Sequence, residues 1–324
     1  MLLAGLRARR ARTRRLWPEC QGQVLAALRA IAAARQLDRP VSCEPITYAR
    51  GGFFSALVEA PAGSRFVKAV PTRSREALFW EAWRRGLIRC EGVHYRLVPP
   101  AEIASGRMVT VLSFPRLQVV RPRKSARSRL FGRDALEVVR ALADFNSDHR
   151  LAEGAFPPAR DCGPVPVPRP RRVARALGVE VERSRAIAAD LRAVEAGWHR
   201  VRGPVDAGDR CLAHMDLGMG NILLDHRPMV MLDFGHAGIA PVGADLHTVL
   251  LYADPDPAAA TEMAEVYAAV FREKGQDVDP AAVLRSAQAH FAARYRDLRF
   301  FSARRPATFD AALALSRELV DAAR

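Results

Sequence analysis

Short runs in which apolar and polar residues alternate occupy the early part of the chain. The runs Phe53–Glu59, Arg65–Val70 and Arg107–Phe114 have the period of two that is typical of strands. A Pro61-Ala62-Gly63 turn joins the first two runs, and Pro115 ends the third. We therefore expect a small antiparallel sheet in this part of the chain.

Apolar residues at helical spacing dominate the rest of the chain. Thr72–Ser74 offers capping side chains for a helix from about Arg75 to Arg85, and Asp134 can cap another. Apolar stripes at helical spacing are Leu136, Val139, Leu142 and Phe145; Ile187, Leu191, Val194 and Trp198; Met263, Val266, Tyr267, Val270 and Phe271; and similar patterns near 281–298 and 308–323. Such stripes indicate core packing rather than cofactor contacts. The Pro-rich stretch Phe156–Pro170 indicates an irregular insertion between helices.

Two apolar runs in the second half of the chain predict a β-hairpin. Ile222–Leu224 and Met229–Leu232 are joined by the polar turn Asp225–Pro228. Asn221 precedes the first run and Asp233 follows the second. Because residues that flank an antiparallel pair meet side by side, we expect Asn221 and Asp233 to lie roughly 5 Å apart.

The residues around this hairpin have the chemistry of phosphoryl transfer. Asn221 ends the segment His214-Met215-Asp216-Leu217-Gly218-Met219-Gly220-Asn221, and Asp233 begins Asp233-Phe234-Gly235. Mg²⁺ is commonly bound by one or two protein oxygens together with substrate phosphates, so Asn221 and Asp233 are candidate ligands. Asp216 lies on the loop that enters the hairpin and is suited to accept a proton from an attacking hydroxyl. Phosphoryl transfer from ATP is therefore the leading interpretation.

Lysine is rare in this chain, which makes each lysine a candidate for a specific role. Lys occurs only at positions 68, 124 and 274, and Lys68 lies within the predicted strand Arg65–Val70. Upstream, Gly51-Gly52 could form a glycine loop over phosphates, toward which Lys68 would point its ammonium group. The alternatives are an ordinary hairpin turn for the glycines and a solvent-exposed position on an edge strand for Lys68.

Two glutamates of the expected helix at 75–85 are candidate partners for Lys68. Glu76 falls in the first turn, where the helix dipole favours a carboxylate whatever the function. Glu81 stands mid-helix among large aromatic residues, where a carboxylate needs a partner. The two positions are about 140° apart around a helix, so both should not face Lys68. We favour Glu81, with Glu76 as the alternative.

Composition indicates an ordinary globular protein. The 324 residues are 49% apolar and 26% charged, which suits one large domain or two small ones. No apolar run approaches the ~18 residues of a spanning helix, so we expect a cytoplasmic protein without a transmembrane segment. The five cysteines are scattered and form no Cys-x-x-Cys pair, which argues against a disulfide framework or a zinc site.

A formal net charge of +15 raises the question of nucleic-acid binding. Arginine concentrates at Arg7–Arg15, Arg121–Arg133 and Arg169–Arg175, without the interleaved aromatic residues of a stacking platform. We therefore predict no nucleic-acid partner and interpret these clusters as solvated segments. Residues 1–40, with a plausible helix at Trp17–Arg35, would form a basic N-terminal extension, for which a tethering arm and a targeting segment are alternatives.

From about Pro45 to Leu250 the chain resembles the aminoglycoside phosphotransferase and choline kinase-like family, the small-molecule branch of the protein-kinase-like fold. The strongest part runs from His214 to Asp233. There the family shows His-x-Asp-x-x-x-x-Asn, a hairpin and an Asp-centred metal motif, followed here by Asp245-Leu246. The resemblance implies an α+β fold with two lobes. A small lobe at 41–116 would hold an antiparallel sheet with one helix, and a larger, mostly helical lobe at 117–324 would hold the catalytic loop and the acceptor site.

The same resemblance implies a role for each candidate residue. These roles are catalytic base for Asp216, Mg²⁺ ligands for Asn221 and Asp233, phosphate binding for Lys68 and for Gly51-Gly52, orientation of Lys68 for Glu81, and structural support for His214 and Asp245.

Together these residues predict an ATP- and Mg²⁺-dependent phosphotransferase that moves the γ-phosphoryl group to a hydroxyl of a small molecule, which is aminoglycoside-, amino-alcohol- or sugar-like. Nine residues separate Gly235 from Asp245 and contain no Ala-Pro-Glu, which leaves no room for the peptide-docking segment of a protein kinase. A non-catalytic nucleotide-binding or basic interaction protein is the other alternative, although such a module has no need for a base.

The local charge of the chain is the one feature of the sequence that bears on the chemical class of the acceptor. Between residues 250 and 280, seven acids face two bases: Asp254, Asp256, Glu262, Glu265, Glu273, Asp277 and Asp279 against Arg272 and Lys274. If these carboxylates line the acceptor site, they favour a cationic amino-alcohol or aminoglycoside-like acceptor. A solvated helical face is the alternative, and an anionic sugar or phosphorylated acceptor stays open through the arginine-rich segments.

Overall fold

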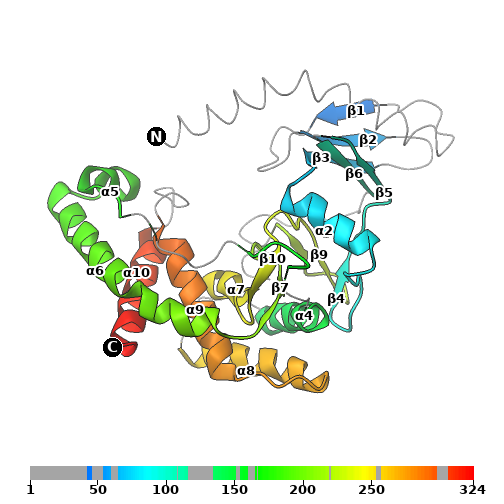
Figure 1. Cartoon of the computed structure of the whole chain (residues 1–324). Helices are drawn as coiled ribbons and strands as arrows, with labels where there is room; N and C mark the ends of the chain where they lie inside the picture. Colours follow the sequence, from blue (N-terminus) through cyan, green and yellow to red (C-terminus); the bar gives the residue numbers. More distant parts are fainter. Residues whose placement is uncertain are drawn as a thin grey trace. The chain divides into compact units, whose positions relative to one another are not determined.

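The computed structural model describes residues 42–45, 54–59, 65–107, 109–115, 134–150, 154–159, 165, 167–218, 220–252, 257–297 and 306–324 (Figure 1). Several expectations lie outside these residues and stay predictions. They concern the glycine pair Gly51-Gly52, the helix at Trp17–Arg35, the clusters Arg7–Arg15 and Arg121–Arg133, and the acids Asp254 and Asp256.

The chain divides by its internal contacts into two compact units. The first comprises Met1–Glu91, Arg96–Pro122 and Val230–Ala237, and the second comprises Gly92–Tyr95, Arg123–Met229 and Gly238–Arg324. The segment Val230–Ala237 lies within the range 117–324 that the sequence indicated for the helical lobe, yet it packs in the first unit. The Asp-Phe-Gly motif is therefore held by the strands and helix of the N-terminal part of the chain.

The first unit contains a five-stranded antiparallel sheet in the order β1-β2-β3-β6-β5. The strands are β1 Ser42–Pro45, β2 Phe54–Glu59, β3 Arg65–Pro71, β6 Val109–Pro115 and β5 Glu102–Ser105. Lys68 lies on the central strand β3, opposite Ser55 of β2 and Leu112 of β6. Its neighbours Val67 and Ala69 are buried, so the alternation of strand side chains places Lys68 on the other face of β3. Lys68 is therefore not on an edge strand.

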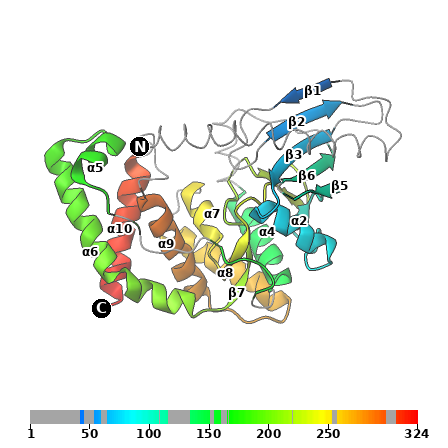
Figure 2. The ribbon, with the colours of Figure 1, turned by 45° about the horizontal axis from the view of Figure 1, so that its top comes forward.

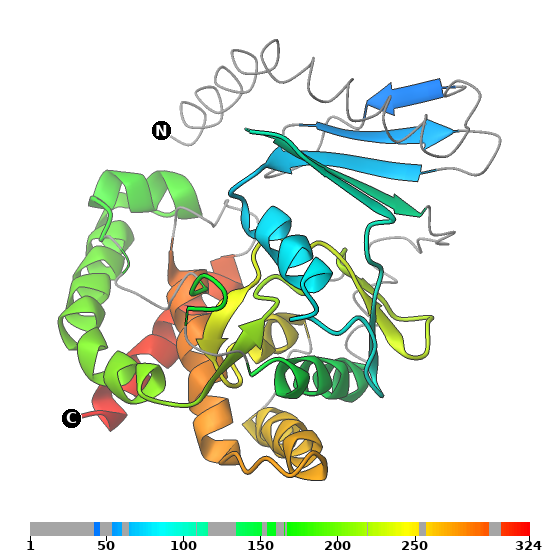
Figure 3. The same ribbon diagram turned by 45° about the vertical axis from the view of Figure 1, so that its right-hand side comes forward.

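Helix α2, Arg75–Arg84, follows β3 directly (Figure 3). The side chain of Ser74 accepts a hydrogen bond from the backbone N–H of Ala77 at 3.2 Å, as expected for an N-cap. Phe79 and Trp80 are buried on one face of the helix. The predicted helix from about Arg75 to Arg85 is confirmed.

The second unit is mostly helical. Its helices are α4 Ala135–Asp148, α5 Pro170–Leu177, α6 Val181–Asp206, α7 Leu246–Tyr252, α8 Pro257–Glu273, α9 Pro280–Arg296 and α10 Pro306–Ala322. Helices α6, α9 and α10 pack on one another (Figure 2). The predicted stripe from Ile187 to Trp198 is buried in the core that these helices share. Asp134 stands at the N-cap of α4 but makes no side-chain cap hydrogen bond, which differs from the expectation.

A buried ion pair joins two of these helices. Arg296 of α9 is fully buried, its guanidinium carbon lies 3.6 Å from the ring centroid of Trp198 of α6, and it pairs with Glu195 at 2.7 Å. A buried arginine needs both a counter-charge and a hydrogen-bonding partner, and α6 supplies the carboxylate together with an aromatic face. Arg296 is thus part of the structural core of the helical unit.

Short strands complete the fold around the predicted hairpin. β7 Arg210–Ala213 and β10 Gly238–Pro241 form an antiparallel pair. β8 Ile222–Leu223 and β9 Met229–Met231 are hydrogen-bonded neighbours in a three-stranded sheet with β4 Tyr95–Leu97. The hairpin expected from the two apolar runs is confirmed. Among the helices that the structure describes, none is long and apolar enough to cross a membrane.

Gly243 occupies a position that other residues cannot take without strain. Its φ is +87°, and a Cβ there would lie 2.6 Å from the carbonyl oxygen of Val283. Its N–H donates to the hydroxyl of Tyr267 at 3.3 Å. The turn at Gly243 leads directly into Asp245, so this glycine helps to place that carboxylate.

We predict that Gly243→Ala lowers the free energy of unfolding by about 2–4 kcal/mol, because it adds backbone strain to a clash with the main chain of α9. Gly203→Ala in α6 is the matched control, since nothing lies within 4 Å of its added Cβ, and it should be neutral or slightly stabilising. Thermal unfolding of both variants measures the difference. Equal melting temperatures would show that the Gly243 turn is not constrained.

Candidate active site

Lys68 lies between two carboxylates within the first unit. Its Nζ is 2.5 Å from Oε2 of Glu76 and 3.0 Å from Oδ1 of Asp233. Burial by itself lowers the pKa of Lys68, but the charges of Glu76 and Asp233 outweigh burial, so the pKa lies above its usual range. Lys68 is therefore a cation at neutral pH, held in place by two carboxylates.

The glutamate that partners Lys68 is Glu76, and the prediction that Glu81 does so is wrong. Glu76 is 4% exposed, and burial raises its pKa above the usual range while the charge of Lys68 opposes that rise. Glu81 instead pairs with Arg84 one turn along the helix at 2.9 Å. The physical reason is the helical face. Residues three and four positions after Glu76 are Phe79 and Trp80, the buried face of α2, so Glu76 shares that face.

The Asp-Phe-Gly motif is anchored to α2 by aromatic packing and by a hydrogen bond. Phe234 is fully buried and stacks on Phe79, with ring centroids 4.0 Å apart and planes 12° apart. Trp80 meets Phe234 edge to face at 5.8 Å. Arg75 Nη1 donates to the carbonyl oxygen of Ala237 at 2.9 Å. Helix α2 therefore fixes both the partner of Lys68 and the segment that carries Asp233.

Asp233 itself has an uncommon backbone conformation. Its φ is +61°, a region that aspartate tolerates better than most residues but that still costs free energy. Its side chain is 50% exposed while its Oδ1 accepts from Lys68. A half-exposed carboxylate held beside a lysine can bind a cation without losing its position.

The segment His214–Asn221, the candidate catalytic loop of the second unit, is held by one buried carboxylate. Asp245 is 1% exposed and accepts hydrogen bonds from the backbone N–H of His214 at 2.7 Å and of Met215 at 2.5 Å. Nδ2 of Asn146 donates to it at 3.2 Å, and the Asn146 oxygen accepts from the hydroxyl of Tyr267 at 2.7 Å. The conformation of the loop is thus set by the protein interior.

Asp216 projects from this loop with its side chain 36% exposed. Its backbone N–H donates to Nδ1 of His214 at 3.3 Å, and its carbonyl oxygen accepts from Nδ2 of Asn221 at 2.7 Å. Because the nitrogen of the Asn221 amide is engaged by the loop, the amide oxygen is the atom that can ligate a cation. Oδ1 of Asp216 accepts a hydrogen bond from Nη2 of Arg294 at 2.6 Å.

Metal binding by this chain would rest on few protein atoms. Within the described ranges, no cluster of three or more His, Cys, Asp or Glu side chains could hold a metal ion. Asn221 in the second unit offers an amide oxygen, and Asp233 in the first unit offers a carboxylate. Each is an oxygen ligand of the kind that Mg²⁺ prefers. The two residues flank the hairpin of β8 and β9 in the sequence.

Comparison with known proteins identifies the family. Residues 57–284, well over half of the chain, match the model of the phosphotransferase enzyme family. The chain belongs to this family. It is therefore a phosphotransferase, an enzyme that transfers a phosphoryl group. No curated protein sequence matches the chain.

Two solved structures to which this phosphotransferase is similar have the same fold. A microcompartment-associated aminopropanol kinase is 17% identical, with a TM-score of 0.51 over 87% of this chain and 91% of the other. A putative aminoglycoside phosphotransferase from Ralstonia eutropha JMP134 is 11% identical, with a TM-score of 0.51 over 92% of this chain and 98% of the other. The predicted α+β, protein-kinase-like fold is confirmed, and the resemblance to the phosphotransferase family with it.

Three residues that contact the candidate catalytic loop or its supporting residues belong to no sequence motif. Arg294 lies 78 positions after Asp216, and no motif marks it. Asn146 and Tyr267 lie on α4 and α8, where the apolar stripes drew attention to core packing alone. The polar atoms of Asn146 and Tyr267 were the signal in the sequence that could have indicated these contacts, because a buried amide or hydroxyl requires a hydrogen-bonding partner.

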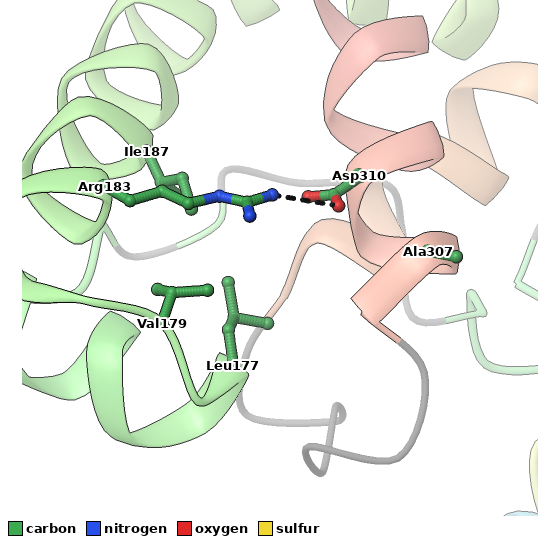
Figure 4. A pocket seen from close by; sticks show the side chains of 6 residues that line it. All are labelled: Leu177, Val179, Arg183, Ile187, Ala307 and Asp310. Atoms are coloured by element: carbon green, nitrogen blue, oxygen red, sulfur yellow. Dashed lines mark ion pairs between the residues drawn. The ribbon is translucent and has the colours of Figure 1, made fainter.

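A hollow in the helical unit of the phosphotransferase has different chemistry (Figure 4). Its volume is about 410 Å³, and it lies where the end of α5 and the start of α6 face α10. The lining residues are Leu177, Val179, Arg183, Ile187, Ala307 and Asp310. Arg183 and Asp310 form an ion pair at 3.5 Å with both side chains well exposed. The lining holds apolar atoms and this one pair, so no catalytic role is assigned to it.

We predict that Glu76→Gln lowers turnover about 10- to 100-fold, because Lys68 loses the carboxylate that positions it. Glu81→Gln is the matched control on the same helix and should leave turnover and the KM for ATP unchanged. Steady-state kinetics of ATP consumption compare the two. A loss in Glu81→Gln equal to that in Glu76→Gln would contradict the assigned pairing.

Proposed function

We propose that this phosphotransferase uses ATP and Mg²⁺ and moves the γ-phosphoryl group to a hydroxyl of a small molecule. The observation that carries the proposal is Lys68, held as a cation by buried Glu76 and placed beside the half-exposed carboxylate of Asp233. A lysine paired with a helix glutamate, beside an Asp-Phe-Gly aspartate, is the arrangement with which kinase-like enzymes bind a triphosphate and its metal.

The chain's own residues divide the work of the reaction. Lys68 binds and neutralises phosphate oxygens. Asn221 and Asp233 would hold Mg²⁺, which would neutralise further charge on the phosphates. Gly51-Gly52, outside the described residues, would cover the phosphates with backbone N–H groups. His214 and Asp245 support the loop that carries Asp216.

Asp216 acts as the base in the proposed step. It orients the acceptor hydroxyl and accepts its proton, while the hydroxyl oxygen forms a bond to the γ-phosphorus. The bond between that phosphorus and the oxygen bridging to the β-phosphate breaks, and ADP leaves with the electron pair. Most of the rate enhancement comes from positioning and from charge stabilisation.

A protein acceptor is disfavoured by the short path after the Asp-Phe-Gly motif. β10, Gly238–Pro241, begins three residues after Gly235, pairs with β7 and is buried along its length. α7 then begins at Leu246. A segment committed to a buried strand and a helix has no free length with which to dock a peptide.

The acidic residues of 250–280 give little support to a cationic acceptor. Glu262, Glu265, Glu273, Asp277 and Asp279 are exposed, and Asp279 caps α9 by accepting from the N–H groups of Ala281 and Ala282. Of those that the structure describes, all therefore fit the alternative of a solvated helical face.

Two aspartate variants separate the proposed roles. Asp233→Asn should abolish turnover and weaken Mg²⁺-dependent nucleotide binding, because a metal ligand loses its charge. Asp216→Asn should keep nucleotide affinity and lower kcat by about 100- to 10,000-fold, because it removes the base. Calorimetric titration of ATP with Mg²⁺ and steady-state kinetics measure the two effects. Equal losses of ATP affinity in both variants would refute this division of roles.

Metal dependence and the acceptor can be tested together. A screen of ATP consumption over amines, aminoglycosides, sugars and nucleosides, with Asp216→Asn as the blank, should give acceptor-dependent turnover that EDTA abolishes and added Mg²⁺ restores. Turnover that persists in excess EDTA would contradict the metal requirement.

A further inference from the structure

Arg294 of α9 touches both the candidate base and the residue before it. Its Nη2 donates to Oδ1 of Asp216 at 2.6 Å, and its Nη1 donates to the carbonyl oxygen of Met215 at 2.5 Å. The side chain of Arg294 is 29% exposed and that of Asp216 is 36% exposed. The planar guanidinium therefore holds two atoms of the loop in a fixed geometry, which a single-point cation would not do.

His247 of α7 holds the guanidinium of Arg294 through a further hydrogen bond. Burial, and next the charge of Arg294, hold the pKa of His247 well below its usual range, so the ring is neutral. Nδ1 lies 2.7 Å from the carbonyl oxygen of Ala244, and Nε2 lies 3.2 Å from Nη1 of Arg294. A neutral ring that donates from Nδ1 must accept at Nε2, which makes His247 an acceptor for Arg294.

The backbone at Met215 shows why a second anchor is needed. Its φ is +63°, a conformation that costs a side-chain-bearing residue free energy. Its N–H donates to Asp245, and its carbonyl oxygen accepts from Arg294. Such strain persists only where the surroundings fix it, and here the two sides of the residue are fixed by Asp245 and by Arg294.

We propose that Arg294 is a positioning residue for Asp216 and that its charge selects against acceptors with an ammonium group beside the reacting hydroxyl. The inference rests on the proposed function, since it takes Asp216 as the base. Two other arginines of α9 make no such contact with the loop. Arg296 is buried against Trp198, and Arg285 forms an exposed ion pair with Asp279 at 3.5 Å.

The selection against ammonium-bearing acceptors follows from the positive charge of Arg294 beside Asp216. An isolated carboxylate attracts an ammonium group, but Asp216 and Arg294 together carry no net charge. An ammonium group beside the hydroxyl would also lie near the guanidinium of Arg294, which is 29% exposed. Repulsion between like charges at close range is a means of excluding a substrate. A neutral or carboxylate-bearing alcohol meets no such repulsion.

The first test replaces Arg294 and follows ATP turnover with the best acceptor of the screen, or with water if no acceptor is found. Arg294→Gln and Arg294→Ala should lower kcat about 10- to 100-fold with the KM for ATP within about two-fold of wild type. The kcat of Arg294→Lys should be intermediate, because lysine keeps the positive charge but cannot donate two hydrogen bonds in the planar arrangement of a guanidinium. Added guanidinium ion should restore part of the activity of Arg294→Ala.

Arg285→Gln, on the same helix, is the matched control and should keep wild-type kinetics. Rescue by guanidinium is the readout that a merely structural role would not give, because a distorted fold is not repaired by a small cation. Wild-type kcat in Arg294→Gln, or a loss without rescue together with a lower melting temperature, would overturn the positioning role.

The second test uses three sugars that differ in charge on one scaffold: glucosamine, glucose and glucuronate. Each is measured as an acceptor or, where it is not phosphorylated, as an inhibitor of ATP turnover. In the wild type, glucosamine should act at least about tenfold more weakly than glucose, and Arg294→Gln should remove most of that difference. Equal action of the three sugars in the wild type, or a difference that Arg294→Gln leaves in place, would overturn the charge selection.

Failure of this inference is distinguishable from failure of the proposed function. If Asp216→Asn lacks turnover while Arg294→Gln behaves as wild type, Asp216 is the base and Arg294 does not position it. If Asp216→Asn retains wild-type turnover, the proposed function itself fails.

Discussion

The buried carboxylate of Asp245 is the constraint on which the candidate catalytic loop depends. It accepts the backbone N–H groups of His214 and Met215 together with the amide of Asn146. A carboxylate taken out of water costs several kcal/mol unless such partners replace the lost hydration. These hydrogen bonds fix the backbone of the loop at the two residues before Asp216, whose side chain is 36% exposed. The backbone geometry next to the candidate base is therefore set by the folding of the core.

In the first unit, α2 plays the corresponding part. One face of this helix carries Glu76, which fixes Lys68, and the rings of Phe79 and Trp80, which hold Phe234. Non-glycine residues with positive φ occur at Met215 and Asp233 among the described residues. One immediately precedes the candidate base and the other is the candidate metal ligand. Strained backbone is found often at functional sites, where it lowers stability but holds a side chain in the geometry that the reaction needs. The conformations of Met215 and Asp233 fit this pattern.

The sequence allowed the elements and the central chemistry to be predicted because these depend on local spacing. Periodicity located the strands, helix α2 and the hairpin, and the residue types around that hairpin indicated phosphoryl transfer. The prediction of Glu81 is wrong because aromatic neighbours in the sequence do not decide which side chain faces Lys68. The spacing of three and four residues decides it, since it places Glu76 on the face of Phe79 and Trp80. Arg294, Asn146 and Tyr267 could not be predicted, since their contacts depend on how distant helices pack. The placement of Val230–Ala237 with the N-terminal strands is likewise a tertiary effect.

In the proposed reaction an alcohol attacks the γ-phosphorus of ATP with Asp216 as its base. Mass spectrometry can follow the products formed from ATP that carries ¹⁸O in the non-bridging γ-phosphoryl oxygens. We expect these labelled oxygens in a phosphate ester of the acceptor, and we expect Asp216→Asn to remove this product while ATP still binds. Label found in inorganic phosphate alone with every acceptor, or an ester formed equally well by Asp216→Asn, would contradict the proposed reaction.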